Sequence, residues 1–343
     1  MQAFVKRERT YGAVELMEIE EPEVAPGQVK ISIKATALCG SDLHAFEYPN
    51  GYEFMQVPVV LGHEYSGIVA EAGAGVTRLK PGDRVMGESN QYCGACANCL
   101  QSRTNICENN KMTGLHTNGG IAEYICVSER IVHRVPENVS FAEAAVAQPC
   151  AVSFHAAFDK SGIKPADLVV VFGPGIVGLM AAQGAKIMGA RQVVVVGTDV
   201  DEEFRMPVAR QLGFFVVNGQ RSDIRQELLK IAGTSAADVV LECSGATAAL
   251  QGAISVVRKG GSITLVGIYS KPLEMFFTPL IRAEVDLRMS YTCTWKNYEQ
   301  ALQLISSGQV DLKPVMTAYP FREGLQAFQD GLAKKVLKPV LML

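Results

Sequence analysis

Residues 168–188 read LVVVFGPGIVGLMAAQGAKIM, which is an apolar run, a glycine-rich turn and a stretch of helix-forming residues. The turn, GPGIVG at residues 173–178, has the strand before it and the helix after it that a dinucleotide-binding turn needs. Its first glycine permits a tight turn, its second lets the backbone approach a pyrophosphate, and its third lets helix and strand pack closely. The helix N-terminus then faces the phosphates, which predicts the cofactor-binding residues Gly173, Gly175, Ile176, Val177 and Gly178. An ordinary strand-to-helix turn is the alternative interpretation.

Apolar strands alternate with helical stretches after Pro165. The predicted strands are Val169–Phe172, Val193–Val196, Phe214–Val217, Val239–Glu242 and Ile263–Val266. Such regular alternation indicates an α/β fold with a doubly wound parallel sheet, buried on both faces. The uncharged stretch Leu168–Ala185 is long enough to suggest a membrane helix, but Pro174 and four glycines interrupt it. We therefore interpret it as strand, turn and helix.

The first 150 residues have a different pattern. Residues 28–36 alternate apolar and polar side chains, as a half-buried strand does, and further short strands follow between Pro and Gly turns. No long amphipathic helix is predicted there, so this region should be mostly β. Because 343 residues are about twice the size of one domain, we expect one domain over 1–150 and a Rossmann nucleotide-binding domain over 151–289. A helix over 297–305 and a strand over 336–343 complete the pattern.

Composition excludes several classes of protein. Hydrophobic residues make up 48% of the chain, which supplies packed cores and argues against disorder. Lys and Arg total 32 against 35 for Asp and Glu, a net charge of −3, so neither nucleic acid nor a membrane surface is an expected partner. The N-terminus has no long apolar stretch with a cleavage site, so we expect a soluble cytoplasmic protein.

The end of the second predicted strand bears on the choice of cofactor. It runs into Gly-Thr-Asp199, and we expect Asp199 to bind the adenosine ribose of NAD. Arg205 and Arg210 follow closely, so NADP stays possible. Cys243, Val266 and Ile268 follow the ends of later strands, where a doubly wound fold binds its ligand, and backbone contacts with the cofactor or ordinary packing are equally plausible roles.

Four cysteines fall within fifteen residues as Cys93-x2-Cys96-x2-Cys99-x7-Cys107. Four thiolates on a turn-rich loop suit a tetrahedral zinc ion, and a closed sulfur shell leaves no position for substrate. We therefore predict a structural zinc, with an iron-sulfur cluster as the alternative. A disulfide framework would suit a small secreted domain instead.

Two further segments contain candidate ligands. Cys39-Gly-Ser41-Asp-Leu-His44 follows the strand over 28–36, and Gly62-His63-Glu64 opens another. These two segments resemble motifs of the zinc-containing medium-chain dehydrogenase/reductase family, especially of its sorbitol dehydrogenase-like polyol dehydrogenases. The same family resemblance includes, in chain order, Gly82-Asp83-Arg84-Val85, the cysteine cluster, the segment 119–124 (GGIAEY) and the glycine turn. The resemblance covers essentially the whole chain.

The resemblance implies a GroES-like catalytic domain, completed by about residues 290–343, that binds a catalytic zinc through Cys39 and His63. Glu64 is then a third ligand or an exchangeable neighbour. Zinc would lower the pKa of an alcohol, Ser41 would accept its proton and His44 would pass that proton to solvent, while hydride goes to nicotinamide. The resemblance also implies two zinc ions per subunit, NAD or NADP as the cofactor, and assembly into a homo-oligomer, either a tetramer or a dimer.

The chain departs from the polyol pattern at Gln148, where those enzymes usually have a glutamate. Its carbonyl oxygen can still bind zinc, and we prefer it as a ligand to Cys150, although sulfur is the softer donor. His116, His133 and His155 stand alone, so we expect surface or core roles for them.

The predicted function is oxidation of a secondary hydroxyl of a polyol or sugar derivative to a ketone with NAD(P). L-threonine 3-dehydrogenase is a close alternative, since residues 82–88 and 102–105 resemble that enzyme. An alternative from another class is a zinc-free nucleotide-binding protein with a structural or regulatory role.

Overall fold

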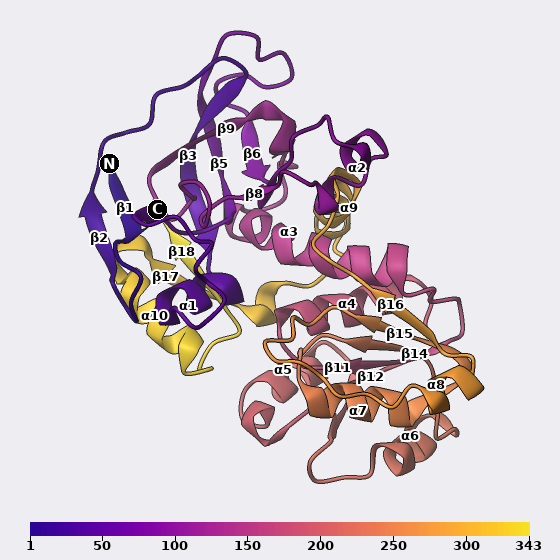
Figure 1. Cartoon of the computed structure of the whole chain (residues 1–343). Coiled ribbons are helices and arrows are strands. Elements are labelled where there is room, and N and C mark those ends of the chain that lie inside the picture. Colours follow the sequence, from indigo (N-terminus) through magenta and orange to yellow (C-terminus); the bar gives the residue numbers. More distant parts are fainter. The chain divides into compact units, whose positions relative to one another are not determined.

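The computed structural model describes residues 1–343, and internal contacts divide the chain into two units. Unit one comprises residues 1–148, 294–308 and 315–343, and unit two comprises residues 149–293 and 309–314. The chain passes from the first unit to the second inside one helix (α3, Phe141–Phe154; Figure 1). None of the helices combines the length and the apolar character that a bilayer crossing requires.

Unit two contains the doubly wound sheet that the sequence predicts. Its strands are β11 (Leu168–Phe172), β12 (Gln192–Gly197), β13 (Phe215–Asn218), β14 (Ala237–Glu242), β15 (Val257–Leu265) and β16 (Asp286–Met289). All pair in parallel, in the order β13-β12-β11-β14-β15-β16. The strand order reverses between β11 and β14, and a crevice at such a switch point is where open α/β sheets bind ligands.

Helices cover both faces of this sheet. They are α4 (Ile176–Ile187), α5 (Arg205–Gln211), α6 (Ile224–Ala232), α7 (Thr247–Val256) and α8 (Thr278–Arg282). Val170 of β11 packs in one core with Leu228 of α6 and Val256 of α7, whereas Figure 1 shows α4 on the opposite face. The strands are therefore apolar on both sides, which explains their continuous Val and Ile runs.

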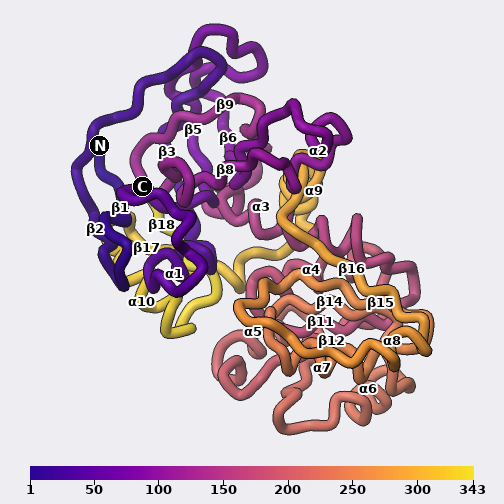
Figure 2. Tube along the Cα trace, viewed as in Figure 1, coloured from indigo at the N-terminus to yellow at the C-terminus, as the bar shows by residue number.

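Unit one is mostly β, as expected. Its strands are β1 (Gln2–Lys6), β2 (Val14–Glu18), β3 (Gln28–Ala37), β4 (Val59–Val60), β5 (Glu64–Ala72), β6 (Arg84–Gly87), β7 (Asn90–Gln91), β8 (Lys111–Met112), β9 (Tyr124–Ser128), β10 (Val132–Arg134), β17 (Met316–Pro320) and β18 (Lys338–Met342). The main sheet has the order β10-β6-β5-β3-β18-β17, with β9 also paired to β3. The last strand, β18, runs antiparallel to β3, so the C-terminal segment lies beside an N-terminal strand (Figure 2).

The helices of unit one include one that the sequence reading missed. They are α1 (Gly40–Glu47), α2 (Ala97–Leu100), α9 (Trp295–Ser306), α10 (Gly324–Leu332) and the first half of α3, with short 3-10 turns between several elements. The sequence predicts no long amphipathic helix before residue 150, and α3 is not amphipathic, but it is a helix that the sequence patterns do not reveal. Residues 144–151 are all buried, so this helix is apolar all round and lacks the one-sided pattern by which a surface helix is recognised.

Candidate metal centres and nucleotide site

The pairing of β3 with β5 brings the first set of candidate ligands together. These strands run antiparallel with Ala37 opposite Glu64. Cys39 follows the end of β3, and His63 immediately precedes β5. The ligand atoms of Cys39, His63 and Glu64 consequently lie within 4.8 Å of one another, close enough to surround one ion.

Asp42 connects the two loops that carry these ligands. Its buried carboxylate accepts hydrogen bonds from the Cys39 N–H at 2.8 Å and from the Gly62 N–H at 3.1 Å. One oxygen also lies 4.0 Å from Nδ1 of His63. The role of Asp42 was not predicted from the sequence, although its place three residues after Cys39, at the start of α1, is the position of an acidic capping residue.

The cluster favours a cation. Burial alone would lower the pKa of His63, but the Cys39 thiolate and the Asp42 carboxylate outweigh it and raise that pKa to about 9. His63 Nδ1 is buried without a hydrogen-bond partner. A cysteine sulfur, a carboxylate and an imidazole in a largely buried cluster are the ligand types that zinc prefers, so these residues fit the metal.

Glu64 has a strong competitor for its negative charge. The ammonium nitrogen of Lys338, on β18, lies 2.7 Å from Oε1 and 2.5 Å from Oε2 of Glu64, and it also donates to the Leu38 carbonyl at 2.8 Å. Both side chains are buried. Glu64 can therefore bind a metal only in competition with a lysine ammonium.

Ser41 and His44 lie one turn apart on α1, so both side chains share one face of that helix. Ser41 Oγ is 3.4 Å from Nε2 of His63. His44 is exposed, and its imidazole makes no hydrogen bond within the chain. The helix α1 therefore places a hydroxyl beside the cluster and an exposed imidazole one turn further along.

Gln148 is buried in α3, where its Nε2 donates to Ser89 Oγ at 3.2 Å. That bond leaves the carbonyl oxygen of Gln148 available as a ligand. Cys150 is also buried and has an interaction of its own.

The four clustered cysteines lie between β7 and β8, with all four sulfur atoms within 4.8 Å of one another. Two sulfur pairs, Cys93 with Cys99 and Cys96 with Cys107, are each 3.9 Å apart. Ligands of a tetrahedral zinc with Zn–S bonds of about 2.3 Å would be about 3.8 Å apart. The N–H groups of Ala95 and Cys96 point at Cys93 and lower its pKa to about 6, which favours the thiolate that binds metal.

Each glycine of the turn after β11 has the environment that its predicted role requires. Gly173 has a φ of +96°, which favours glycine in this tight turn. A Cβ on Gly175 would meet nothing within 4 Å, whereas a Cβ on Gly178 would lie 1.9 Å from the Gly173 carbonyl oxygen. Gly175 is also the N-cap of α4 and has no side-chain cap, so the first N–H groups of the helix are free for an anion.

Asp199 lies just beyond the end of β12. Its Oδ1 accepts hydrogen bonds from Asn218 Nδ2 at 2.8 Å and from Arg221 Nε at 2.6 Å. The Asn218 amide lowers the pKa of Asp199 most, so the group is an anion. Its Oδ2 makes no such bond, and the side chain is 52% exposed.

The ends of β14 and β15 are tied together by a residue that the sequence reading missed. The buried Glu242 carboxylate accepts from the Ser244 N–H at 2.8 Å and from the Tyr269 hydroxyl at 2.6 Å. Cys243 and Val266 are held by backbone bonds to Phe172 and Glu242, and burial raises the pKa of the Cys243 thiol. Ile268 is exposed. Of these three candidates, Ile268 alone presents an exposed side chain.

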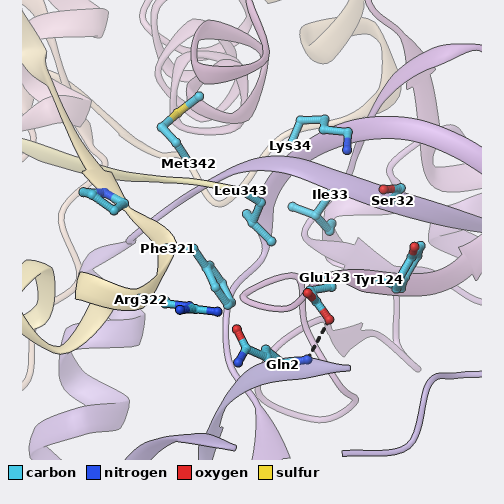
Figure 3. A pocket seen from close by; sticks show the side chains of 11 residues that line it. Gln2, Ser32, Ile33, Lys34, Glu123, Tyr124, Phe321, Arg322, Met342 and Leu343 are labelled. Carbon is cyan, nitrogen blue, oxygen red and sulfur yellow. Dashed lines mark hydrogen bonds between the residues drawn. The ribbon is translucent and has the colours of Figure 1, made fainter. Parts of the chain in front are cut away.

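A separate pocket of about 520 Å³ opens in unit one (Figure 3). It is lined by Gln2, Ser32, Ile33, Lys34, Glu123, Tyr124, Pro320, Phe321, Arg322, Met342 and Leu343. Glu123 is already bound by the Gln2 N–H at 2.8 Å. None of the candidate metal ligands lines this pocket, so it lies apart from the metal cluster.

Comparison with known proteins places the chain in a family. Residues 25–137 match the alcohol dehydrogenase GroES-like domain, and residues 177–307 match the zinc-binding dehydrogenase domain. The sorbitol dehydrogenase of Halalkalibacterium halodurans is 36% identical, with 98% of each chain covered. The D-arabitol-phosphate dehydrogenase of Enterococcus avium is 31% identical, over 99% of this chain and 97% of that one.

Two further relatives widen the comparison. The L-threonine 3-dehydrogenase of Rhizobium etli is 34% identical over 98% of each chain. The crystal structure of a zinc-binding dehydrogenase from Sinorhizobium meliloti bound to NADP is 25% identical, with a TM-score of 0.90 over 100% of this chain and 99% of that one.

The chain therefore belongs to the zinc-containing medium-chain dehydrogenase/reductase family and is similar to its polyol dehydrogenases. Its fold is a GroES-like domain with a Rossmann domain, as predicted, and it is a zinc-dependent NAD(P) oxidoreductase that acts on alcohol groups.

Proposed function

We propose that this dehydrogenase oxidises a secondary hydroxyl of a small-molecule polyol or sugar derivative to the ketone, reversibly, with hydride transfer to NAD(P). The observation that carries the proposal is the convergence of Cys39, His63 and Glu64 beside Ser41, in a chain that also holds an open glycine turn. The sorbitol and D-arabitol-phosphate dehydrogenases among its relatives support this substrate class.

The catalytic domain predicted over 1–150 and about 290–343 would correspond to unit one (1–148, 294–308 and 315–343), and the nucleotide-binding domain predicted over 151–289 would correspond to unit two (149–293 and 309–314). The four-cysteine lobe would hold a structural zinc. A catalytic zinc would be bound by Cys39 and His63, with Glu64 or the carbonyl oxygen of Gln148 as a further ligand. The lysine ammonium on Glu64 favours Gln148 for that position.

When bound, zinc supplies Lewis acidity toward the alcohol oxygen, and nicotinamide supplies the hydride acceptor. Ser41 would accept the alcohol proton, because its hydroxyl lies beside His63. His44, one turn along α1 and exposed, would pass the proton to solvent. Asp42 would keep the loops of Cys39 and His63 in register.

The cofactor would lie on Gly173, Gly175, Ile176, Val177 and Gly178, with Cys243, Val266 and Ile268 at its edge. NAD would be preferred to NADP, because Asp199 keeps a free, exposed oxygen for the ribose hydroxyls.

Metal analysis beside activity tests these roles. The wild type should contain two zinc ions per subunit and reduce NAD(P) on a polyol panel, whereas Cys39→Ser should keep one zinc and lose activity. One zinc in both proteins would favour the nucleotide-binding alternative without a catalytic metal. No turnover of any polyol by the two-zinc protein would refute the substrate class.

L-threonine 3-dehydrogenase activity is the second candidate, because a relative with that activity is 34% identical over 98% of the chain. Turnover of L-threonine without turnover of polyols would establish it in place of the polyol proposal.

We also propose a cytoplasmic homo-oligomer, a tetramer or a dimer. All nine cysteines are free thiols, which suits a reducing compartment. The edge strand β16 is unpaired on one side, and the exposed Met289 on it would be covered in an oligomer. Neither nucleic acid nor a membrane is a proposed partner.

A further inference from the structure

Four rings form a continuous row in unit one. The ring centroids of His44 and Tyr52 are 5.9 Å apart, those of Tyr52 and Phe54 are 5.5 Å apart, and those of Phe54 and His116 are 5.2 Å apart. The rings come from α1, from the loop that leads to β4, and from the turn after β8. Phe54, one of the two inner rings of the row, is 46% exposed.

Both ends of the row are attached to the loops of the metal cluster. His44 shares α1 with Ser41, and the negative charges of Cys39 and Asp42 add to burial in raising the pKa of Tyr52. At the other end, a Cβ on Gly114 would lie 2.7 Å from the Gly62 nitrogen, so the turn that carries His116 packs directly on the residue before His63. The row is therefore connected to both loops that carry the candidate metal ligands: to the Cys39 loop through α1, and to the His63 loop through the turn at Gly114.

Several polar atoms of the row are available to a ligand. Nδ1 of His116 accepts a hydrogen bond from the Met112 N–H at 3.0 Å. The neutral ring therefore carries its proton on Nε2, which makes no bond within the chain. The Tyr52 hydroxyl makes none either. An aromatic face with a donor on each side matches the alternating C–H and O–H groups of a polyol chain.

Charge around the row bears on the kind of polyol. Arg9 lies near the row, where its guanidinium donates to the carbonyl of Met55, the residue after Phe54, at 3.4 Å. Between Tyr52 and Phe54 the chain carries the acidic Glu53, held by the Gly51 N–H at 2.9 Å. The negative charge of Glu53 opposes a phosphate ester bound beside it, whereas an uncharged polyol carries no charge for it to repel.

We propose that Tyr52 and His116 are specificity-determining residues that bind hydroxyls remote from the reacting carbon, with Phe54 against the C–H groups between them, and that the substrate is an unphosphorylated polyol. This inference rests on the proposed oxidation of a polyol. It gives His116 a role in substrate binding, beyond the surface or core role expected from sequence.

The two residues can be tested with matched variants. His116→Asn keeps an acceptor for the Met112 N–H but removes the outer donor, whereas His116→Gln restores a donor near the Nε2 position. Tyr52→Phe removes only a hydroxyl, and Tyr124→Phe removes one from the separate pocket as a control (Figure 3). Zinc content and thermal midpoint establish that each variant is folded.

We expect the wild type to prefer sorbitol to sorbitol 6-phosphate. His116→Asn and Tyr52→Phe should each raise the KM for sorbitol about tenfold, the loss of one hydrogen bond, and leave the KM for the dinucleotide unchanged. His116→Gln should recover part of the loss, and Tyr124→Phe should have no effect. Calorimetric titration of sorbitol into the protein with reduced cofactor should show the same order of affinities without turnover.

Two results would overturn this assignment while leaving the proposed function intact. One is a higher kcat/KM for sorbitol 6-phosphate than for sorbitol, and the other is a sorbitol KM that is no more sensitive to His116→Asn and Tyr52→Phe than to Tyr124→Phe. Turnover of L-threonine alone would refute the proposed function and this inference together.

Discussion

Lys338 and Glu64 form a buried ion pair, with Nζ 2.5 Å from Oε2, between residues that are 274 positions apart. Burial favours the neutral form of Lys338, but the charges of Glu64 and Cys39 outweigh it and raise the pKa of the lysine. The last strand of the chain thus supplies a positive charge to the candidate zinc cluster. In the proposed function this pairing would keep Glu64 as a neighbour, and not a ligand, of the catalytic zinc.

Replacing this lysine should destabilise the metal-free protein. Lys338→Met leaves a buried carboxylate without its partner, which costs about 3–5 kcal/mol. Zinc should recover part of this loss, because the released Glu64 carboxylate can then bind the ion. Urea unfolding with and without zinc measures both effects.

Lys335→Met is the matched control. The Lys335 side chain is 70% exposed, and its ion pair with Asp330 is long, with 3.8 Å between Nζ and Oδ1. It should change the free energy of unfolding by less than about 1 kcal/mol. Equal losses in the two variants would contradict a special role for Lys338.

The glycine turn allows stability and cofactor binding to be separated. A Cβ at position 175 meets nothing within 4 Å, so Gly175→Ala should fold normally. It should nevertheless fill the space that a pyrophosphate needs, and we expect the Kd of NADH to rise by about tenfold or more, or about 1.4 kcal/mol. Fluorescence titration of NADH measures this change.

Gly178→Ala is the contrasting variant. Its Cβ would lie 1.9 Å from a backbone oxygen, so the turn must shift, and we expect the free energy of unfolding to fall by about 1–3 kcal/mol. If Gly175→Ala lost stability and kept its NADH affinity, the assigned roles of these two glycines would be wrong.

His133 predicts a pH dependence in unit one. Its buried ring lies between two carboxylates, with Nδ1 2.5 Å from Glu299 and Nε2 3.0 Å from Glu88, and its centroid is 3.7 Å from that of Trp295. Burial opposes the charge, but Glu299 and Glu88 raise the pKa of His133. The stability that the charged ring contributes is therefore fully present below about pH 6.5 and is lost as the pH rises through the higher folded pKa.

The fluorescence of Trp295, the single tryptophan, reports this titration because protonated imidazole quenches indole. We expect a transition above pH 6.5, with brighter emission at high pH. Glu299→Gln removes one carboxylate and should move the transition to lower pH. An unmoved transition would show that Glu299 does not hold the proton on His133. The guanidinium of Arg78 also lies 4.8 Å from the Trp295 ring.

Local sequence patterns predicted the parts of the fold that neighbouring residues determine. The β11 strand, the turn at Gly173–Gly178 and helix α4 are encoded within about twenty residues, by apolar residues and glycines whose roles are steric. Helix α3 was missed because it is buried on all sides, so its sequence has no polar face to give it a period.

The sequence predicted which residues of the candidate site could bind a metal, but it did not predict the residues that hold those side chains in place. Cys39 and His63 are chemically distinctive and lie in short motifs, so the sequence grouped them into one hypothesis. Lys338 is an ordinary lysine in sequence, and only the pairing of β18 with β3 brings it to Glu64. Glu242 likewise links the ends of β14 and β15 only because the fold brings the Tyr269 hydroxyl within 2.6 Å of its carboxylate.

Asp199 provides a test of cofactor choice. Arg221 and Asn218 both bind one of its oxygens, so the other would be available to the ribose hydroxyls of NAD in the proposed function, and the charge of Asp199 would oppose a 2′-phosphate. Asp199→Asn should therefore raise the ratio of kcat/KM for NADP to that for NAD by about tenfold or more. Glu202→Gln is the control. Glu202 accepts a hydrogen bond from the same Asn218 amide at 2.9 Å, and the substitution removes an equal charge. An equal rise in both variants would mean that general electrostatics, and no specific ribose contact of Asp199, determine the preference.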